Sequence, residues 1–206
     1  MMNVYNRFVL PRLVHFTCSA RPNMRQRRKL VPLARGDVLE VGIGSGLNLP
    51  FYDPEKVDKV WGLEPSPQMR AMASKAAEEA PFEVELVAAF GEEIPLDGGR
   101  FDTVVITYTL CSIPETEPAL REVARVLKPG GRLLFCEHGA APDAGVRRWQ
   151  DRLDPVWRRL GGGCHLNRDI PALLGAAGFE ITGMETMYLP GWRPASFNYW
   201  GAAVPR

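Results

Sequence analysis

A run of glycines directly after an expected strand is the part of the sequence best suited to bind a ligand. The stretch 38–46, Val-Leu-Glu-Val-Gly-Ile-Gly-Ser-Gly, places Glu40 in the strand and glycines at Gly42, Gly44 and Gly46. Glycine allows a tight turn and a close approach of main-chain N–H groups to a ligand, because it has no Cβ. In a doubly wound sheet this turn lies at the carboxyl ends of the strands, where ligands bind. We therefore expect a ligand-binding loop here.

Two acids near this loop indicate the kind of ligand. A dinucleotide fingerprint requires a third glycine or an alanine where this sequence has Leu47, and the charge of Glu40 would repel a pyrophosphate. A carboxylate there instead attracts the ammonium or sulfonium group of a cationic ligand. Glu64 ends the next expected strand, twenty residues after Gly44, where a carboxylate can accept both hydroxyls of a ribose. These features predict an adenosyl amino acid as the ligand.

The elements that must position the loop follow from the hydrophobic pattern. Short runs rich in Val, Leu, Ile and Phe alternate with helix-length segments, which is typical of a parallel sheet covered on both faces. The expected strands are 37–41, 59–63, 83–87, 101–107 and 132–136, followed by an antiparallel pair at 179–187 and 196–204. The expected helices are 67–80, 115–127, 146–160 and 168–177, and the Lys-Pro-Gly-Gly run at 128–131 is expected to stop the second helix and turn. The fold class is a doubly wound, Rossmann-like α/β sheet of seven strands, five of them parallel, with helices on both faces.

Composition indicates one globular α/β domain spanning 1–206. Of the 206 residues, 46% are hydrophobic and 24% charged, and the longest apolar runs fall far short of the ~18 residues that span a bilayer. The opening sequence has no uninterrupted apolar segment, so we expect neither a signal peptide nor a membrane-spanning helix, and a cytoplasmic location. Within the domain we distinguish a helical N-terminal arm (residues 1–36) and a lid or insertion region (residues 138–178). The sequence indicates no particular oligomeric state.

The N-terminal arm is strongly basic. It holds eight basic residues and no acid, which leaves 17 basic against 24 acidic residues in the rest of the chain. The eight are Arg7, Arg12, Arg21, Arg25, Arg27, Arg28, Lys29 and Arg35. The arm is also amphipathic, so it could cover a bound ligand, make a peripheral membrane contact or simply present a solvated face. The acidic remainder of the chain argues against a nucleic acid as partner.

The sequence resembles class I methyltransferases that depend on S-adenosylmethionine (SAM). Four features carry the resemblance: the glycine loop, the acid after the second strand, Phe-Asp-Thr-Val-Val at 101–105 and Leu-Lys-Pro-Gly-Gly-Arg-Leu-Leu at 127–134. The resemblance covers roughly residues 37–136. It implies that SAM is the cofactor and S-adenosylhomocysteine the product. It also implies a set of cofactor residues: Glu40, Gly42, Gly44 and Gly46 for the methionine part, Glu64 and Pro65 for the ribose, Phe90, Gly91 and Glu92 for the adenine, and Thr107 at the end of the fourth strand. Phe90 stands where this family usually has an aspartate.

Candidates for the acceptor site follow the fourth and fifth strands. His138 titrates near neutral pH, so it is either a general base that takes a proton from the acceptor or a structural hydrogen-bonder. Four tryptophans either line an apolar acceptor pocket or pack the lid, namely Trp149, Trp157, Trp192 and Trp200. The cysteines, which are Cys18, Cys111, Cys136 and Cys164, form no CxxC pair, so we expect reduced thiols, with Cys111 in the core and no metal site.

A narrower resemblance appears in four runs: Thr-Leu-Cys-Ser-Ile-Pro at 109–114, Cys-Glu-His-Gly-Ala-Ala-Pro-Asp at 136–143, the segment 149–169, and Leu-Pro-Gly-Trp at 189–192. They are similar to the methyltransferase group that contains membrane-associated thiol S-methyltransferases. This similarity implies a small lipophilic thiol, or sulfide, as the methyl acceptor. The sequence departs from that group in lacking its hydrophobic N-terminal helix and in having His165 where a second cysteine is common.

Two other interpretations remain open at this point. One is an enzyme that methylates the nitrogen of a phospholipid headgroup or a quinone precursor, for which the arm would serve as the membrane contact. The other is a SAM-binding module without catalysis, because an intact cofactor loop indicates binding and not turnover.

Overall fold

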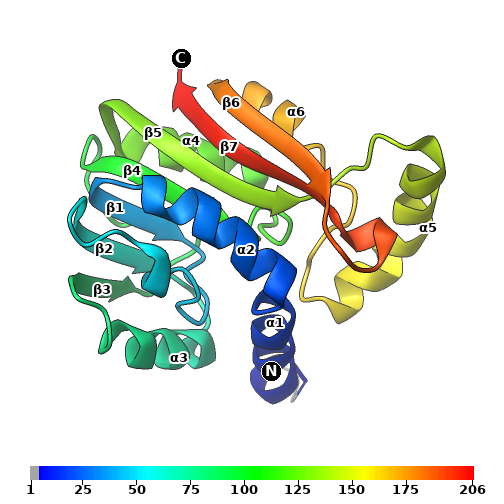
Figure 1. Ribbon diagram of the computed structural model, residues 1–206, viewed down its shortest axis with the longest axis horizontal. Helices are drawn as coiled ribbons and strands as arrows, with labels where there is room; N and C mark the ends of the chain where they lie inside the picture. Colours follow the sequence, from blue (N-terminus) through cyan, green and yellow to red (C-terminus); the bar gives the residue numbers. More distant parts are fainter. Residues whose placement is uncertain (1–4) are drawn as a thin grey trace.

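The computed structural model describes residues 5–206 and confirms the predicted seven-stranded sheet (Figure 1). The first four residues of the N-terminal arm lie outside this range. Strand order across the sheet is β3-β2-β1-β4-β5-β7-β6. The first five strands are mutually parallel, whereas β7 pairs antiparallel with both β5 and β6. The strands are β1 (Gly36–Val41), β2 (Val57–Leu63), β3 (Glu83–Val87), β4 (Phe101–Thr107), β5 (Leu127–His138), β6 (Phe179–Tyr188) and β7 (Phe197–Pro205).

Helices cover both faces of the sheet. They are α1 (Leu10–Cys18), α2 (Arg21–Leu30), α3 (Pro67–Ala77), α4 (Thr116–Val126), α5 (Ala144–Leu160) and α6 (Ile170–Ala176), with a short π-helical turn at Tyr5–Val9 before α1. Figure 1 shows α2 crossing the front face of the sheet and α4 and α6 behind it. The described chain contains no helix that is both long and apolar enough to cross a bilayer.

Local sequence explains where the helices that flank the cofactor loop begin and how they pack. Ser66 caps α3 by accepting a hydrogen bond from the Met69 N–H, and Pro67 takes the first helical position, where no N–H is needed. In α4 the buried side chains are Ala119, Leu120, Val123 and Val126. This spacing of three and four residues gives one apolar face, which packs on the sheet. The two faces of the sheet thereby bury two hydrophobic clusters, one with α4 and α6 and the other with α2 and α3.

The segment around Lys128 differs from the expected strand at 132–136. Helix α4 does end at Val126, close to the predicted end, but β5 begins at Leu127 and includes the Lys-Pro-Gly-Gly run. Phe101 pairs with Leu127 and Thr103 already pairs with Arg132, so residues 128–131 bulge out of the ladder. Gly130, with φ 78°, lets the chain turn back into register.

The N-terminal arm is ordered into α1 and α2, and the lid region is dominated by α5. Leu30 and Val31 at the end of α2 are fully buried against β1 and β5, which anchors the arm to the domain. The long α5 lies beyond the end of β5, away from the other helices (Figure 1). It is followed by the turn Gly161–Gly163, which returns the chain toward the sheet. The arm and the lid region therefore meet at the carboxyl ends of the parallel strands.

Candidate active site

A cavity of about 520 Å³ lies at the carboxyl ends of β1, β2 and β4. Such a volume is in the range of small-molecule and cofactor sites. Most of the residues predicted to bind a cofactor line it: Gly42, Gly44, Glu64, Pro65, Phe90, Gly91, Glu92 and Thr107. Of the other predicted positions, all of them within residues 5–206, Glu40, Gly46 and His138 do not line the cavity. The three strand ends that the sequence placed at one edge of the sheet thus do converge there.

The glycine loop needs glycine for two separate reasons. Gly42, Gly44 and Gly46 have φ values of 72°, 58° and 80°, a left-handed conformation that other residues adopt only with strain. A Cβ on Gly42 would collide with the Thr109 side chain, and one on Gly46 would lie 2.8 Å from the Cβ of Ala76. The nearest atom to a Cβ on Gly44 would be the flexible end of Met69, at 3.3 Å, and the Gly42 carbonyl would lie at 3.9 Å, an ordinary contact. Gly42 and Gly46 are therefore fixed by packing, whereas Gly44 faces the cavity.

Glu64 connects the second strand to the glycine loop. Its carboxylate accepts hydrogen bonds from the Gly44 N–H at 3.1 Å and from the Ser66 N–H at 2.8 Å. Burial raises the pKa of Glu64, and these two N–H groups act in the opposite direction by stabilising the charged form. The side chain lines the cavity and has lone pairs left for ligand hydroxyls.

Glu40 lies beneath the loop rather than in the cavity wall. One carboxylate oxygen accepts a 2.7 Å hydrogen bond from the Tyr52 hydroxyl and the other a 2.9 Å bond from the Asn48 amide. Burial raises the pKa of Glu40 to about 7, although Tyr52, Arg27 and Asn48 favour its charged form. In this arrangement Glu40 supports the floor of the site through its neighbours.

Arg27 is a functional candidate that sequence reasoning did not single out. It was counted among the basic residues of the arm, but its side chain is buried and lines the cavity. The guanidinium donates hydrogen bonds to Asn48 Oδ1, at 2.7 Å, and to Thr107 Oγ1. It also lies over the Tyr108 ring, 5.1 Å from the centroid. A fixed positive charge therefore sits where the arm meets the ends of β1 and β4.

Helix α1 contributes to the wall of the cavity. Its contribution is mostly apolar and consists of Leu10, Pro11, Val14, His15 and Cys18. His15 Nδ1 lies 2.7 Å from Ser45 Oγ, a hydrogen bond that ties α1 to the glycine loop. The arm therefore covers the cavity, which is one of the roles that its amphipathic sequence allowed.

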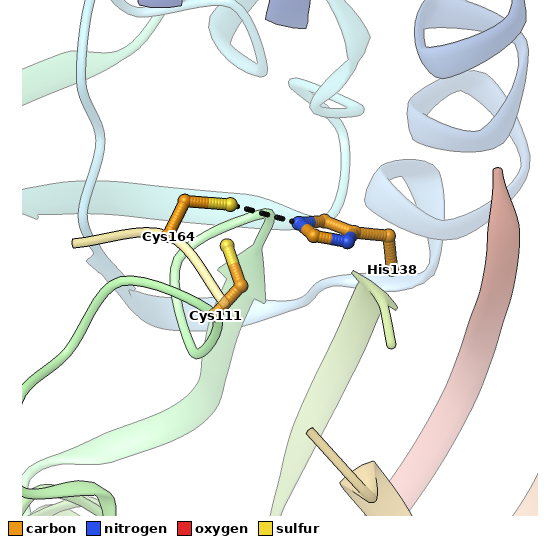
Figure 2. A group of neighbouring side chains, drawn as sticks. All are labelled: Cys111, His138 and Cys164. Atoms are coloured by element: carbon orange, nitrogen blue, oxygen red, sulfur yellow. Dashed lines mark hydrogen bonds between the residues drawn. The ribbon is translucent and has the colours of Figure 1, made fainter. Parts of the chain in front are cut away.

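A sulfur and imidazole cluster lies next to this cavity (Figure 2). His138 at the end of β5 has its Nε2 atom 3.2 Å from Cys164 Sγ, and Trp157 Nε1 donates to the same sulfur at 3.4 Å. Cys111 projects toward His138 and Cys164 from the loop after β4. The two cysteine sulfur atoms and a ring nitrogen of His138 all lie within 4.8 Å of one another. The sequence could not reveal this group, because its members are at least 26 residues apart in the chain.

The electrostatics of this cluster distinguish its two thiols. The hydrogen bond from Cys111 lowers the pKa of Cys164, and His138 lowers it further, while the pKa of Cys111 is raised. Burial alone would lower the pKa of His138, but the neighbouring Cys164 raises it overall. Cys164 is thus the thiol that carries negative charge, hydrogen-bonded to His138. Its charge also contributes to the raised pKa of Cys18 in the cavity wall, which is caused first by burial, so the cluster and the cavity are electrostatically linked.

Buried polar side chains hold the loops of the cluster in place. Glu137 accepts hydrogen bonds from the N–H groups of Thr109, at 2.7 Å, and Leu110, at 3.1 Å. Gln150 of α5 donates to the carbonyls of Gly139, Leu166 and Pro194, each at 2.9 Å. Trp157 of the lid region packs against Trp192 with ring centroids 5.5 Å apart, and neither ring lines the cavity. This favours packing over pocket lining for these two tryptophans.

Comparison with known proteins assigns the family. A methyltransferase domain model matches residues 39–135. The chain is 37% identical over 172 residues to thiol S-methyltransferase TMT1B of Rattus norvegicus, covering 81% of this chain and 70% of the relative. It is 34% identical over 206 residues to thiol S-methyltransferase TMT1A of Homo sapiens, covering 93% and 84%. This chain belongs to the SAM-dependent methyltransferases, in the group of these relatives.

The fold agrees with this assignment. The crystal structure of a SAM-dependent methyltransferase from Thermotoga maritima, described as a possible histamine N-methyltransferase, superposes with a TM-score of 0.69 over 98% of each chain at 22% identity. Because the chain belongs to the SAM-dependent methyltransferases, the enzyme uses SAM, and its cavity fits that cofactor. Gly44 has no side chain and so leaves room for a ligand in the cavity. Glu64, directly after β2, offers an acceptor for ribose hydroxyls. A methyltransferase also needs an acceptor site beside the methyl group, and both α1 and the loop after Cys111 adjoin the cofactor cavity.

Proposed function

We propose that the methyl acceptor of this enzyme is a small lipophilic thiol. The observation that carries the proposal is the wall formed by the arm, where apolar Leu10 and Val14 accompany a buried cation of the cavity, Arg27. An apolar wall suits a lipophilic chain, and a guanidinium favours an anionic nucleophile over a cationic one. A thiol has a reference pKa near 8.5, so it forms an anion readily, whereas an aliphatic amine would enter as a cation. The thiol S-methyltransferase names of the relatives support the same choice.

The proposed cofactor contacts follow from the cavity. SAM supplies a methyl group on a sulfonium centre, which a nucleophile displaces in line. Gly44 offers its open backbone to the amino acid part, Glu64 and Pro65 hold the ribose, and the Phe90 to Glu92 segment flanks the adenine. Thr107 lies at the floor with Arg27 and Asn48 and fixes the end of β4. Glu40 acts indirectly, by orienting Asn48 and Tyr52.

His138 is proposed to assist removal of the acceptor's proton. It does not line the cavity, but it adjoins the Cys111 to Pro114 loop, of which Ser112 and Ile113 form part of the cavity wall. A group there can lower the proton affinity of a bound thiol without touching the cofactor. His138→Ala should therefore slow methyl transfer while leaving SAM affinity unchanged. Turnover equal to that of the unmodified enzyme would return His138 to a structural role.

The test of the acceptor proposal combines binding and product detection. The protein is titrated calorimetrically with SAM and S-adenosylhomocysteine, and then incubated with alkyl thiols, sulfide, amines, a quinone precursor and phosphatidylethanolamine vesicles. Methylation of alkyl thiols, with amines and phospholipid unmodified, supports the proposal. Methylation of the headgroup or of the quinone precursor instead would replace it with one of those two acceptors, and binding without any turnover would overturn the thiol assignment.

We also propose that the arm makes a peripheral contact with an anionic membrane from the cytoplasmic side, and that no nucleic acid is bound. The outer face of α1 exposes Leu13 and Phe16, the latter by 77%, and the basic residues Arg12 and Arg21 are close to them in the chain. Apolar side chains flanked by arginines are typical of interfacial helices, and lipophilic thiols concentrate in membranes. Co-sedimentation with vesicles containing phosphatidylserine should fall with salt and with Leu13→Ser/Phe16→Ser. Met184→Ser, which changes an exposed residue on β6, is the matched control.

A further inference from the structure

We propose that Cys111, His138 and Cys164 form a binding site for a thiophilic divalent cation, Zn²⁺ first among them, with one coordination position left for the acceptor sulfur. This inference rests on the proposed thiol acceptor for its purpose, although the ion site itself can be tested without any acceptor. Figure 2 shows the three side chains converging from three separate segments on one point. Those segments are the loop after β4, the end of β5 and the turn after α5.

The spacing of the ligand atoms suits a tetrahedral ion. Zn–S bonds of about 2.3 Å and Zn–N bonds of about 2.0 Å give tetrahedral edges of roughly 3.5 to 3.8 Å. His138 Nε2 and Cys164 Sγ are 3.2 Å apart, and every pair within the group lies within 4.8 Å. Shifts of about an ångström or less, within the reach of a rotamer adjustment, would bring all three atoms to bonding distance. Thiolate and imidazole ligands select zinc and other soft or borderline ions over Mg²⁺ or Ca²⁺.

Each ligand is held by the surrounding structure. The loop that carries Cys111 is fixed by Glu137 and by the His165 N–H, which donates to the Cys111 carbonyl at 2.8 Å. Cys164 follows the turn Gly161–Gly163 and accepts the Trp157 hydrogen bond. His138 is anchored by the backbone pairing of β5 with β7. Hydrogen bonds thus hold the backbone at all three ligand positions.

Chain neighbours of the cluster residues line the cavity. Ser112, next to Cys111 in the chain, and Gly162, two residues before Cys164, both line the cavity, as does Cys18 of α1. The ligand set of two cysteines and one histidine leaves a tetrahedral ion with one free position, which is the arrangement of catalytic rather than structural zinc sites. We place the free position toward this cavity, so that an acceptor sulfur reaches the ion from the site that holds the cofactor.

The ion would supply the deprotonation that the acceptor needs. The thiol R–SH loses its proton to solvent buffer and its sulfur binds the ion as a thiolate, because a bound cation lowers the pKa of a ligating thiol. A sulfur lone pair then forms the new S–CH₃ bond while the C–S bond of the sulfonium breaks. The electron pair of that bond stays on the departing S-adenosylhomocysteine sulfur, and no atom of the ion or the protein is oxidised or reduced. In this scheme His138 assists removal of the acceptor's proton as a ligand of the ion, without taking the proton itself.

The first experiment asks whether the site binds metal, with no acceptor present. The full-length chain is purified under reducing conditions, stripped with a chelator and titrated with Co²⁺ and Zn²⁺. We expect about one ion per chain by elemental analysis, and for Co²⁺ the visible bands of a tetrahedral ion together with thiolate-to-metal charge transfer. Mg²⁺ should neither displace the ion nor raise the melting temperature. Absence of sulfur charge transfer in the Co²⁺ form would overturn the proposal.

Variants locate the ion. Cys111→Ser and Cys164→Ser should each lower ion affinity by on the order of tenfold or more. Cys136→Ser is the matched control, because Cys136 is a buried cysteine of β5 outside the cluster. Circular dichroism verifies that each variant is folded. If a variant does not fold, the Co²⁺ spectrum of the unmodified chain still tests whether cysteine sulfur binds the ion. Full ion affinity in both Cys111→Ser and Cys164→Ser would show that the ion binds at a different site. Loss of two free thiols in air, with no ion retained, would show that the two cysteines form a redox pair instead of an ion site.

Turnover separates this inference from the proposed function. If the stripped enzyme methylates alkyl thiols at the full rate, the ion has no role in the reaction and the thiol acceptor stands. If the chain binds the ion at this cluster but methylates no thiol, the proposed function fails and the ion site stands. Loss of thiol methylation on stripping, restored by Zn²⁺ and not by Mg²⁺, is the result expected when both hold.

Discussion

The Arg27 guanidinium donates a 2.7 Å hydrogen bond to the side-chain oxygen of Asn48, directly beneath the glycine loop. Asn48 in turn donates to Glu40 at 2.9 Å, so a cation from α2 and an acid from β1 share one buried amide. This chain of contacts joins the N-terminal arm to the floor of the cofactor cavity. Removing the Arg27 cation leaves only Tyr52 and Asn48 to stabilise the charge of Glu40, and it leaves the Asn48 oxygen without its donor, which is destabilising in a buried site.

Arg27→Met should therefore destabilise the enzyme and weaken SAM binding together. We expect a loss of roughly 2 to 4 kcal/mol in the free energy of unfolding, because hydrogen bonds to Asn48 and Thr107 are lost in a buried site. Chemical denaturation and calorimetric titration measure the two effects. Arg28→Met, which changes the neighbouring exposed arginine, is the control and should leave both nearly unchanged. Similar behaviour of the two variants would show that the buried network contributes little.

Gly44→Val should abolish detectable SAM binding while the chain still folds. The new side chain would occupy the cavity side of the loop, where the end of Met69 is the nearest group. Valine also strains the left-handed backbone there, at φ 58°. Gly99→Val provides the matched control, since Gly99 has φ 64° but no atom within 4 Å of an added Cβ. Calorimetry with both variants separates loss of binding from strain, and normal SAM affinity in Gly44→Val would place the ligand elsewhere.

Glu64→Ala should lower SAM affinity by about 1 to 3 kcal/mol, because a carboxylate that accepts two ribose hydroxyls forms charge-assisted hydrogen bonds. The Gly44 and Ser66 N–H groups also lose their acceptor, so part of the effect comes from a less ordered loop. Comparing SAM with its 2′-deoxyribose analogue isolates the hydroxyl contribution. The unmodified enzyme should discriminate between these two ligands more strongly than the variant does. Equal discrimination would remove Glu64 from the ribose site.

Phe90→Ala should weaken SAM binding with little change in stability. Phe90 lines the cavity yet is 62% exposed, so its ring contributes little to the core and is free to stack on an adenine. Stacking of an aromatic side chain on a base is worth about 1 to 3 kcal/mol. Phe90→Leu keeps apolar area but not the aromatic face, and it should show most of the loss. An unchanged dissociation constant in both variants would mean that only the Phe90 backbone contacts the cofactor.

The pH dependence of stability should reflect Glu40. Its pKa is raised from 4.5 to about 7, mainly by burial, so the folded protein binds a proton there that the unfolded chain releases. Stability contributed by this proton is fully present below pH 4.5 and is lost as the pH rises through 7. Glu40→Gln, which keeps the contacts to Asn48 and Tyr52, should therefore be more stable relative to the unmodified enzyme at about pH 8 than at about pH 5, by on the order of 2 to 3 kcal/mol.

Urea denaturation of Glu40→Gln and of the unmodified enzyme, from about pH 5 to pH 8, measures this difference in the free energy of unfolding. The groups facing Glu40 are Tyr52, Asn48 and Arg27, and none of them changes in the variant. A difference in stability that stays constant from about pH 5 to pH 8 would show that Glu40 keeps an ordinary pKa.

Much of the cofactor side was predictable because its signals are local. The strand, the glycine turn and Glu64 lie within 28 residues, and glycine at every second position of the turn indicates left-handed backbone, which the structure has at Gly42 and Gly44. The strand and helix positions were predictable for the same reason, since side-chain periodicity is a property of neighbouring residues. The bulge at 128–131 was not, because its existence depends on pairing between Leu127 and Phe101 across the sheet.

The acceptor side depended on contacts between distant segments. Arg27 looks in the sequence like one basic residue among eight, and it becomes a buried group of the site only when α2 crosses the sheet. Cys111, His138 and Cys164 have no motif spacing, so the expectation of isolated thiols without a metal site followed from sequence alone. Their meeting is decided by three elements packing at one end of the sheet.

The sequence by itself determined the sheet, the glycine loop and the cofactor class, because each follows from residue type and short-range spacing. The tertiary structure decided which cation faces the cavity, which thiol is charged and which helix closes the site. Those properties depend on burial and on distances between atoms far apart in the chain, such as the 3.2 Å between His138 and Cys164. Burial and proximity set pKa values and ligand geometry, and no linear spacing encodes either one.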